Sequence, residues 1–251
     1  MSPAAERPTT SAALAPQSAH PPGRVTAGPL VLRRMEVEDA GIVAAVVRES
    51  LDHLRPWMPW ATKEAADRRT QLARIAEADE LWDSGTDYIY AIFAPGEGVP
   101  GGDGGGLVGG AGGSAGDRPV GGGFVGGRSA GNSSGDRSGG NKDGALVGTI
   151  GLHCRAAEDV IEIGYWVAVG QTRRGYGTVA ARAATSLAAA LPGIRHVEIH
   201  CDEANLASAA IPRKLGYRLD RTEPHEPEAP GERGRRMIWI WDCDGAADGA
   251  R

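Results

Sequence analysis

The sequence predicts a mixed α/β domain with a mostly antiparallel sheet and helices on both of its faces. Segments rich in β-branched and aromatic residues alternate with segments whose apolar residues recur at helical spacing. Two strand-like segments are joined by only four residues, which is typical of a hairpin and of antiparallel pairing. One passage runs strand, turn, helix, strand, and this order predicts a single parallel βαβ step.

The first folded elements are expected after a polar tail. Residues 1–29 are rich in Ala, Pro, Ser and Thr and lack the apolar core of a signal peptide, so we expect a disordered tail. A short strand is expected at residues 30–34. A helix is expected over residues 35–54, because its apolar residues have helical spacing and Pro56 disfavours its continuation.

A stiff loop, a second helix and a strand complete the N-terminal half. Residues 56–61 contain two Trp and two Pro, which indicates a preformed loop with a large apolar surface. A helix is expected over residues 63–83. The segment 87–94 is aromatic and β-branched and is expected to be a strand.

The pattern stops between residues 95 and 144. Of the 38 glycines in the chain, 22 lie in this stretch, and its few apolar residues show no period. Such a stretch has too little apolar surface to offset the entropy lost on ordering. It predicts a flexible insertion between two strands, and its glycines have no flanking strand and helix to form a phosphate site.

Regular patterns resume at residue 145. Strands are expected at 146–154 and 159–169, a helix at 178–192, a strand at 195–202, a helix that ends at Gly216, and a strand at 235–244. The last residues, 245–251, are expected to be a frayed tail.

Composition excludes several classes of protein. The net charge of −5 gives no basic surface for nucleic acid and slightly favours a cationic substrate. No apolar run is long enough for a membrane span. Cys154, Cys201 and Cys243 show no metal-binding spacing, which predicts reduced, mostly buried thiols in a cytoplasmic protein.

A candidate anion site lies where the strand 159–169 turns into the following helix. The loop carries Arg173, Arg174, Gly175 and Gly177 directly before the helix. A helix N-terminus offers unpaired N–H groups and a partial positive charge, and arginines add charge-assisted hydrogen bonds. The alternative is a glycine turn with solvated arginines.

Three stretches resemble motifs of the GNAT superfamily of N-acetyltransferases. The family's acetyl-CoA motif, Gln/Arg-x-x-Gly-x-Gly/Ala, is similar to IEIGYWVAVGQTRRGYGTVAARAAT. The motif that follows it, Asn-x-x-Ser and then Lys/Arg-Leu-Gly-Phe/Tyr, is similar to EIHCDEANLASAAIPRKLGY. The loop in LRPWMPWA resembles that of the RimJ/RimL type, which acetylates ribosomal-protein N-termini. The resemblance covers about residues 30–244 without the insertion.

The resemblance implies the GNAT fold, acetyl-CoA as co-substrate and no metal. It places the pantetheine arm along the backbone of Trp166, Val167, Ala168 and Val169. It assigns the pyrophosphate to Arg173, Arg174, Gly175, Tyr176, Gly177 and Thr178. Asn205 and Ser208 would lie near the thiol end of the cofactor, and Glu162 would occupy the place of the general base.

The chemistry of amine acetylation requires these residue types. An amine must be neutral to attack a thioester, and a carboxylate can accept its proton directly or through water. Glu162 alternates with Ile161 and Ile163 and so shares a strand face with Gly164, which would leave room for substrate. Ser208 would donate a hydrogen bond to the departing thiolate. The strand pattern alone favours a solvent-exposed surface carboxylate at Glu162, whereas the resemblance favours the general base.

Other candidates have alternative interpretations. Glu198 and His200 share one strand face and would serve as a base or in a water relay, although a solvent-accessible edge pair is favoured. His153 and His196 receive no role. Trp57, Met58 and Trp60 would either pack in the core or line the substrate site, with Trp57 and Trp60 as the substrate-binding candidates.

Two residues depart from the family pattern. Thr172 stands where the motif prefers Gln or Arg. Pro212 lies inside the expected helix after Asn205 and cannot donate to the Ser208 carbonyl, so we expect a kink that re-aims Ser208 or Asn205.

The sequence therefore predicts an N-acetyltransferase that moves an acetyl group from acetyl-CoA directly to a primary amine. A protein or peptide N-terminus is the favoured acceptor. A small-molecule amine, a non-catalytic acyl-CoA-binding module and an insertion that acts as a lid remain alternatives. No nucleic-acid or membrane partner is expected, and a homodimer is left open.

Overall fold

The computed structural model describes residues 20–95 and 142–243. These residues form one eight-stranded sheet with the strand order β1-β2-β3-β4-β5-β6-β8-β7. Neighbouring strands are antiparallel except β5 and β6, which run parallel. The predicted fold class, with one parallel step, is confirmed. The expected segments at 1–19, 96–141 and 245–251 lie outside the described residues.

The N-terminal half begins earlier than the sequence predicts. Strand β1 (Arg24–Ala27) pairs with β2 (Leu30–Arg34), so placing residues 20–29 in a disordered tail was wrong. Strand β1 is only four residues long and lies at the sheet edge, and such a strand has little periodicity to reveal it. Helix α1 (Ala40–Leu54) follows a 3₁₀ turn, Val37–Asp39, and ends one residue before Arg55, as Pro56 predicts.

Helix α2 (Arg68–Ser84) starts five residues later than expected. A 3₁₀ turn, Glu64–Ala66, precedes it, and the Asp67 carboxylate caps the helix by accepting from the Arg69 N–H. Gly85 ends it with a left-handed backbone, φ 76°. Strand β3 (Asp87–Ala94) has the bounds that the sequence predicts.

The C-terminal half contains one strand that the sequence did not reveal. Its elements are β4 (Ala145–Ala157), β5 (Val160–Val167), α3 (Tyr176–Ala189), β6 (His196–Asp202), α4 (Leu206–Leu215), β7 (Arg218–Pro224) and β8 (Arg235–Asp242). The unexpected strand β7 is an edge strand of mostly charged, exposed residues, so it lacks the alternation of a half-buried strand. Strand β4 is longer than expected, and only residues 158 and 159 separate it from β5.

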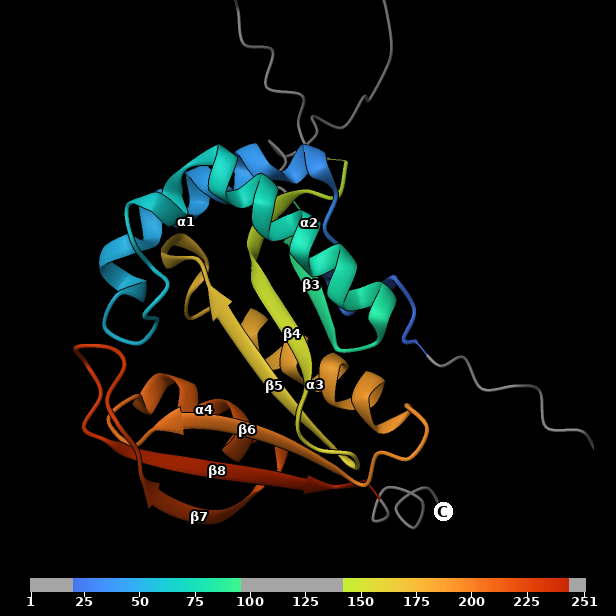
Figure 1. The fold of residues 1–251 in the computed structure, drawn as a ribbon, viewed down its shortest axis with the longest axis vertical. Helices are drawn as coiled ribbons and strands as arrows, with labels where there is room; N and C mark the ends of the chain where they lie inside the picture. The colour runs from blue at the N-terminus through green and yellow to red at the C-terminus, as the bar shows by residue number, and fades with distance from the viewer. Residues whose placement is uncertain (1–19, 96–141, 244–251) are drawn as a thin grey trace, which may run out of the picture.

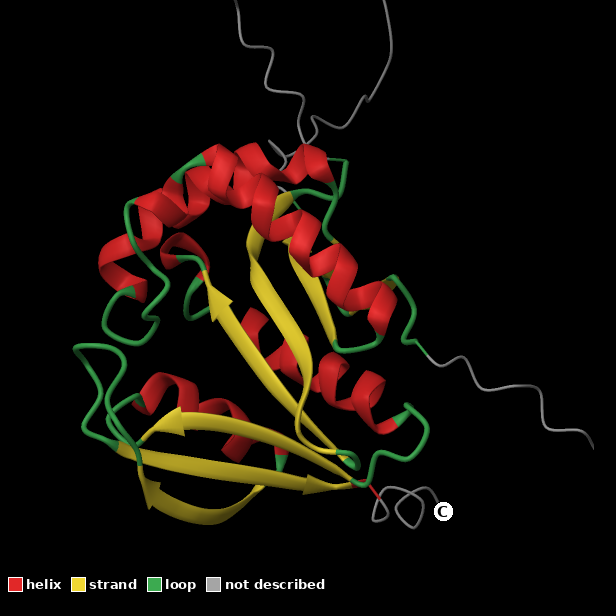
Figure 2. Cartoon of the chain, viewed as in Figure 1, coloured by secondary structure: helices red, strands yellow, loops and turns green. Residues whose placement is uncertain are grey.

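The helices cover both faces of the sheet, as expected (Figure 1). Helices α1 and α2 lie in front in this view, and α3 lies behind β4 and β5 (Figure 2). Each face has its own buried cluster. Ile161 and Ile163 of β5 pack with α3, whereas Trp166 packs with Val43 and Val47 of α1. The alternation predicted for β5 is therefore confirmed, and Glu162 shares the α1–α2 face with Trp166.

The three cysteines are free. Cys154 is exposed, so the expectation of buried thiols was wrong for this residue, whereas Cys201 and Cys243 are half-buried. Cys154 lies close to the end of β4 that turns toward β5.

Candidate active site

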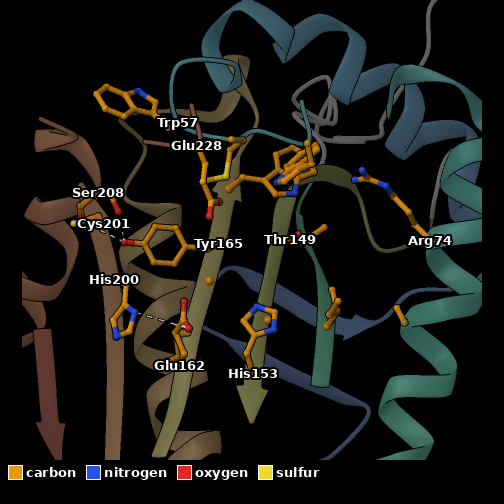
Figure 3. Close-up of a pocket in the computed structure, with 18 of the residues that line it drawn as sticks. Trp57, Arg74, Thr149, His153, Glu162, Tyr165, His200, Cys201, Ser208 and Glu228 are labelled. Atoms are coloured by element: carbon orange, nitrogen blue, oxygen red, sulfur yellow. Dashed lines mark hydrogen bonds and ion pairs between the residues drawn. The ribbon is translucent and has the colours of Figure 1, made fainter. Parts of the chain in front are cut away.

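A cavity of about 770 Å³ opens on the sheet face that α1 and α2 cover (Figure 3). Strands β4, β5 and β6 supply its floor, and α2 with the 56–61 loop supplies its wall. The floor residues come from neighbouring strands and include Thr149, Gly151, His153, Glu162, Gly164, Trp166 and His200. The cavity thus contains the predicted base Glu162 and, from α4, both Asn205 and Ser208.

The cavity lies where β5 and β6 part. The parallel register joins residues 160–162 of β5 to residues 196–198 of β6, and Glu162 is the last paired residue on β5. Beyond it β5 continues beside β4, and β6 continues beside β8. The expected opening between the two parallel strands is present at this point.

Glu162 lies at the vertex of this opening. Its side chain is 27% exposed and turns toward the cavity, and its Oε2 is 3.9 Å from Nδ1 of His200. A carboxylate that is half-buried and open to a cavity can accept a proton from a bound amine. Glu162 is therefore a candidate for the general base, and this role stays a prediction.

Glu198 and His200 form a tight pair beside Glu162. Nε2 of His200 is 2.6 Å from Oε2 of Glu198. Strand β6 lies inside the sheet and Glu198 is only 8% exposed, so the favoured interpretation as a solvent-accessible edge pair was wrong. Glu162, His200 and Glu198 instead form a chain of carboxylate, imidazole and carboxylate across two strands. Figure 3 shows the contact between Glu162 and His200.

Ser208 faces Tyr165 across the opening between β5 and β6. The Tyr165 hydroxyl is 3.2 Å from Oγ of Ser208 and donates to the Ser208 carbonyl at 3.3 Å. Burial raises the pKa of Tyr165, although the hydrogen bond to Ser208 acts in the opposite direction. The phenol is therefore a neutral hydrogen-bonding group at neutral pH.

Asn205 has a structural task in addition to its place in the cavity. It is the N-cap of α4, and its Oδ1 accepts from the Ser208 N–H at 3.1 Å. Helix α4 runs through Pro212 as one element from Leu206 to Leu215. The carbonyl that Pro212 leaves without its helical donor is the one that Tyr165 binds, so Ser208 is held from both sides.

The loop between β5 and α3 has the backbone of an anion-binding turn. Arg173 has φ 60° and Gly175 has φ 80°, and α3 begins directly after Gly175. Left-handed residues alternating with ordinary ones turn successive N–H groups toward one concave side. Arg173, Arg174 and Gly175 are exposed, which leaves the loop open to a ligand.

Two of the expected cofactor contacts have protein partners. The Ala168 N–H donates to the Val147 carbonyl at 2.7 Å, and the Val169 N–H donates to Oγ of Ser50 at 3.1 Å. Gly177 is close-packed, since a Cβ there would lie 3.1 Å from Cδ1 of Ile211. This glycine thus permits α3 to approach α4, which is a packing reason that the motif alone does not reveal.

Trp57 and Trp60 both line the cavity, as the substrate-binding interpretation requires. Trp60 packs on Trp166 with ring centroids 5.8 Å apart, and the Arg74 guanidinium lies 5.2 Å from the Trp60 ring centre. Trp60 therefore serves the core and the cavity together. Trp57 lies at the mouth beside Glu228 (Figure 3).

A second loop reaches the mouth of the cavity from between β7 and β8. The Gly231 N–H donates to the Pro56 carbonyl at 2.8 Å and joins this loop to the loop at residues 56–61, which we call the tryptophan loop. Asp202 fixes the end of the β7–β8 loop that leads into β8, because its buried carboxylate accepts from the N–H groups of Arg233, Gly234 and Arg235. Burial acts to raise the pKa of Asp202, but these backbone hydrogen bonds lower it overall.

Sequence reasoning missed His153, Tyr165 and the β7–β8 loop. His153 was given no role because only the register of β4 against β5 places it beside Glu162. Tyr165 was missed because its partner is the Ser208 carbonyl. The available signal was Pro212, which implies that this carbonyl needs another donor.

A family model described as an acetyltransferase (GNAT) domain matches residues 129–218. Over these residues the chain matches a GNAT acetyltransferase domain. The match spans the strands and the loop that make up the cavity floor and the candidate anion site. The predicted activity, acetyl transfer, is confirmed at this level.

Solved acetyltransferases share the GNAT fold of this chain. RimL, a ribosomal L7/L12 alpha-N-protein acetyltransferase in complex with coenzyme A, is 14% identical with a TM-score of 0.63 over 87% of this chain and 97% of that chain. The ribosomal-protein-S5-alanine acetyltransferase from Vibrio fischeri is 11% identical with a TM-score of 0.63 over 88% and 97%. The microcin C7 self-immunity acetyltransferase MccE, in complex with acetyl-CoA and AMP, is 12% identical with a TM-score of 0.62 over 86% and 93%.

These neighbours bear out the expected resemblance to the RimJ/RimL type in fold. Two of them are complexes with coenzyme A or acetyl-CoA, in agreement with acetyl-CoA as the co-substrate of this acetyltransferase. Among curated proteins, none matches the sequence. Within residues 20–95 and 142–243, no group of His, Cys, Asp and Glu has the arrangement of a metal site. No helix of the described part is long and apolar enough to cross a membrane.

Proposed function

We propose that this GNAT domain transfers the acetyl group of acetyl-CoA directly to the N-terminal amine of a protein or peptide. The observation that carries the proposal is the position of Glu162. It is the last β5 residue paired with β6, it faces the cavity, and it lies across from Ser208 at the start of α4. The acceptor amine and the thioester would meet between these two residues.

Glu162 would act on the amine. An N-terminal amine with a pKa near 8 is mostly protonated at neutral pH, and its ammonium form cannot attack a carbonyl carbon. Glu162 takes the proton, and His200 and Glu198 behind it add polar groups that keep this part of the cavity hydrated or hydrogen-bonded. The neutral nitrogen then attacks the thioester carbon, the C–N bond forms and the C–S bond breaks.

Ser208 would act on the leaving group. Its hydroxyl lies at the N-terminal turn of α4, where it can donate a hydrogen bond to the departing thiolate. The Tyr165 hydroxyl binds both Oγ and the carbonyl of Ser208 and keeps this side chain at the opening. Holding the two reactants together supplies much of the rate enhancement in such direct transfers.

Acetyl-CoA would enter from the side of the β5–α3 loop. The exposed loop with Arg173, Arg174 and Gly175 and the N-terminal turn of α3 would bind the pyrophosphate, including Tyr176, Gly177 and Thr178. The pantetheine arm would run along Trp166, Val167, Ala168 and Val169 to the opening between β5 and β6. Thr172 makes a local hydrogen bond to the Val169 carbonyl and so stabilises the loop.

The mouth of the cavity favours a cationic acceptor that reaches in by one end. Glu77, Glu228 and Glu232 line it together with Trp57 and Trp60. The carboxylates attract the ammonium group of a peptide N-terminus. The flat aromatic side chains can contact an extended peptide backbone without selecting one particular side chain of the peptide. The fold neighbours that act on ribosomal-protein N-termini support the same acceptor class, and that class would place the reaction in the cytoplasm.

A panel assay tests the proposal. Release of coenzyme A thiol from acetyl-CoA is measured with N-terminal peptides and with small amines, for the wild type, Glu162→Gln and Glu223→Gln. Glu223 is the matched control because it is a half-buried strand carboxylate paired with Arg221, and it does not line the cavity. Peptide-dependent release that drops at least about tenfold in Glu162→Gln only is the expected result.

The other outcomes separate the alternatives. Release of coenzyme A thiol with small amines but not with peptides would show that the acceptor is a small-molecule amine. Tight acetyl-CoA binding without release for any amine would indicate a binding module, and no acetyl-CoA binding would contradict the proposal as a whole.

A further inference from the structure

A row of ionisable residues crosses the cavity floor at one level of the sheet. Asp87 of β3 is the register partner of His153 on β4, His153 is the partner of Glu162 on β5, and Glu162 is the partner of Glu198 on β6. Side chains at one register level point to the same face. The row therefore places an imidazole directly beside the proposed base, on the cavity side (Figure 3).

Two glycines provide the space that the imidazole of His153 occupies. A Cβ at residue 151 would lie 2.6 Å from Nε2 of His153, and a Cβ at residue 164 would lie 3.0 Å from it. Gly151 and Gly164 are themselves register partners, one level closer to Trp166 than Glu162 is. The imidazole of His153 thus occupies part of the space beside Gly164, and Gly164 still lines the cavity.

Asp87 lies behind the imidazole. Oδ2 of Asp87 is 3.1 Å from Nδ1 of His153, and the two side chains are 13% and 14% exposed. The contact has the distance of an ion pair without the angle of a hydrogen bond. The Asp87 carboxylate thus orients the ring, while Nε2 is directed over the glycines toward the end of β5 where the thioester would lie.

The reaction itself requires two proton acceptors. An ammonium acceptor loses one proton before it can attack and a second when the C–N bond has formed. Glu162 accounts for the first proton. Within the described residues, His153 is the neighbouring group that lies between Glu162 and the Trp166 end of the floor.

We propose that His153 is a second catalytic residue of the acetyl transfer, seated over Gly151 and Gly164 and oriented by Asp87, and that its Nε2 accepts the proton that leaves the acceptor nitrogen as the C–N bond forms. One proton thus goes to Glu162 and the other to His153. The two residues return them to the coenzyme A thiolate and to water, so the charge balances. The inference rests on the proposed function.

Other charged groups share the cavity with His153. They come from α2, β5, β6, β8 and the β7–β8 loop and are Arg74, Glu77, Glu162, His200, Asp202, Arg236, His225, Glu228 and Glu232. Replacing Asp87 by Asn removes the negative charge behind His153 and leaves the other charged side chains of the cavity in place. Asp87→Asn is therefore the variant that isolates the pair.

The experiment compares kcat and the pH profile of kcat/KM for wild type, His153→Gln, Asp87→Asn and Gly151→Ala, with the best acceptor peptide of the panel. His196→Gln is the matched control, because His196 and Asp242 form a similar cross-strand pair, with Nδ1 and Oδ1 2.9 Å apart, outside the cavity. Gly151→Ala displaces the ring without removing an ionisable group and covers the case in which His153→Gln fails to fold.

We expect His153→Gln to lower kcat by about 100-fold, the lower end for a positioned acid or base, with KM for acetyl-CoA unchanged. His153→Gln should also change the pH profile of kcat/KM, because a proton acceptor is removed, and Asp87→Asn should lower kcat, because the imidazole loses the carboxylate that orients it. Gly151→Ala should lower kcat, and His196→Gln should leave kcat unchanged.

Two results would overturn the inference. The first is a wild type that acetylates the peptide while His153→Gln keeps kcat within about twofold at every pH. The second is an equal loss in all three cavity variants with the pH profile of kcat/KM unchanged in His153→Gln, which is the mark of a purely structural role. A wild type that releases no thiol with any amine contradicts the proposed function itself, and the inference with it.

Discussion

At the scale of single residues, Pro212 and Tyr165 explain each other. A proline inside a helix has no N–H for the carbonyl four residues earlier, which is that of Ser208. A buried carbonyl without a donor destabilises the fold, and Tyr165 supplies that donor from the neighbouring strand. The proline thus leaves the Ser208 carbonyl able to accept from the tyrosine hydroxyl, while the expected re-aiming of Ser208 by Pro212 stays a prediction.

Tyr165→Phe tests this arrangement. Loss of the hydroxyl leaves the Ser208 carbonyl without its donor, so the free energy of unfolding should fall by about 1–3 kcal/mol. The Ser208 hydroxyl also loses its neighbour, so kcat should fall by about tenfold. Urea unfolding and steady-state kinetics measure the two effects.

Tyr217→Phe is the matched control for this prediction. The Tyr217 hydroxyl is 2.6 Å from Oγ1 of Thr185 and is buried in the cluster that packs against α3, and Tyr217 does not line the cavity. It should lose stability and keep kcat. Equal kcat in the two variants would show that Tyr165 only stabilises the fold.

At the scale of elements, two loops that are distant in sequence close the acceptor end of the cavity. The tryptophan loop follows α1, and the other loop joins β7 to β8. Their contact is the hydrogen bond from Gly231 to the Pro56 carbonyl. A Cβ at residue 231 would lie 2.5 Å from that carbonyl oxygen, so only glycine permits this approach.

Gly231→Ala should therefore separate the two loops. We expect KM for the acceptor peptide to rise by about tenfold, because a displacement of about 1 Å in a positioning loop is costly. KM for acetyl-CoA should be unchanged, since the loop proposed to bind its pyrophosphate is a different one, between β5 and α3. Gly23→Ala is the control, because a Cβ at Gly23 meets no atom within 4 Å. An equal rise in the KM values for the peptide and for acetyl-CoA would show that the substitution disturbs the fold as a whole and not only the acceptor end of the cavity.

At the scale of the whole molecule, the described ends of the insertion are fixed close together. Ala94 of β3 and Ala145 of β4 are register partners. Asp143 binds Arg24 and Arg33, each at 2.6 Å, and thereby joins the start of β4 to β1 and β2. The sequence assigned Asp143 to the flexible insertion, whereas its side chain is only 3% exposed, so that boundary was wrong for this residue.

Deletion of residues 96–141 should leave a stable and active domain. The closure term for the loop between β3 and β4 falls by about 2 kcal/mol when it shortens to four residues, and the strand register does not need to change. Chemical unfolding and the peptide assay measure stability and kcat. A large change in kcat or KM would instead favour the interpretation of the insertion as a lid.

Asp143→Asn in the shortened chain adds a pH test. The hydrogen bond from Arg24, together with Arg33, lowers the pKa of Asp143 to about 2 despite partial burial. A lowered pKa stabilises the fold above the unfolded value, near 4, and this contribution disappears as pH falls toward 2. The stability difference between the two chains should therefore be constant above about pH 5 and vanish toward pH 2.

The element order and the fold class followed from the sequence because they depend on local patterns. Aromatic and β-branched residues predicted β3, helical spacing of apolar residues predicted α1, and a glycine at residue 216 marked the end of α4. The edge strands β1 and β7 escaped, since one is short and the other is charged and exposed. Their strand conformation depends on a neighbour that the local sequence does not show.

The candidate active site divides in the same way. The sequence by itself determined the loop before α3, the face on which Glu162 lies and the presence of Ser208 at the start of α4, because each is a matter of spacing along one element. Only the tertiary structure decided that His153 lies beside Glu162, that Tyr165 binds the Ser208 carbonyl and that the loop with Gly231 meets Pro56. Those contacts join residues from different elements, and strand register and the parting of β5 from β6 fix them, which no local pattern encodes.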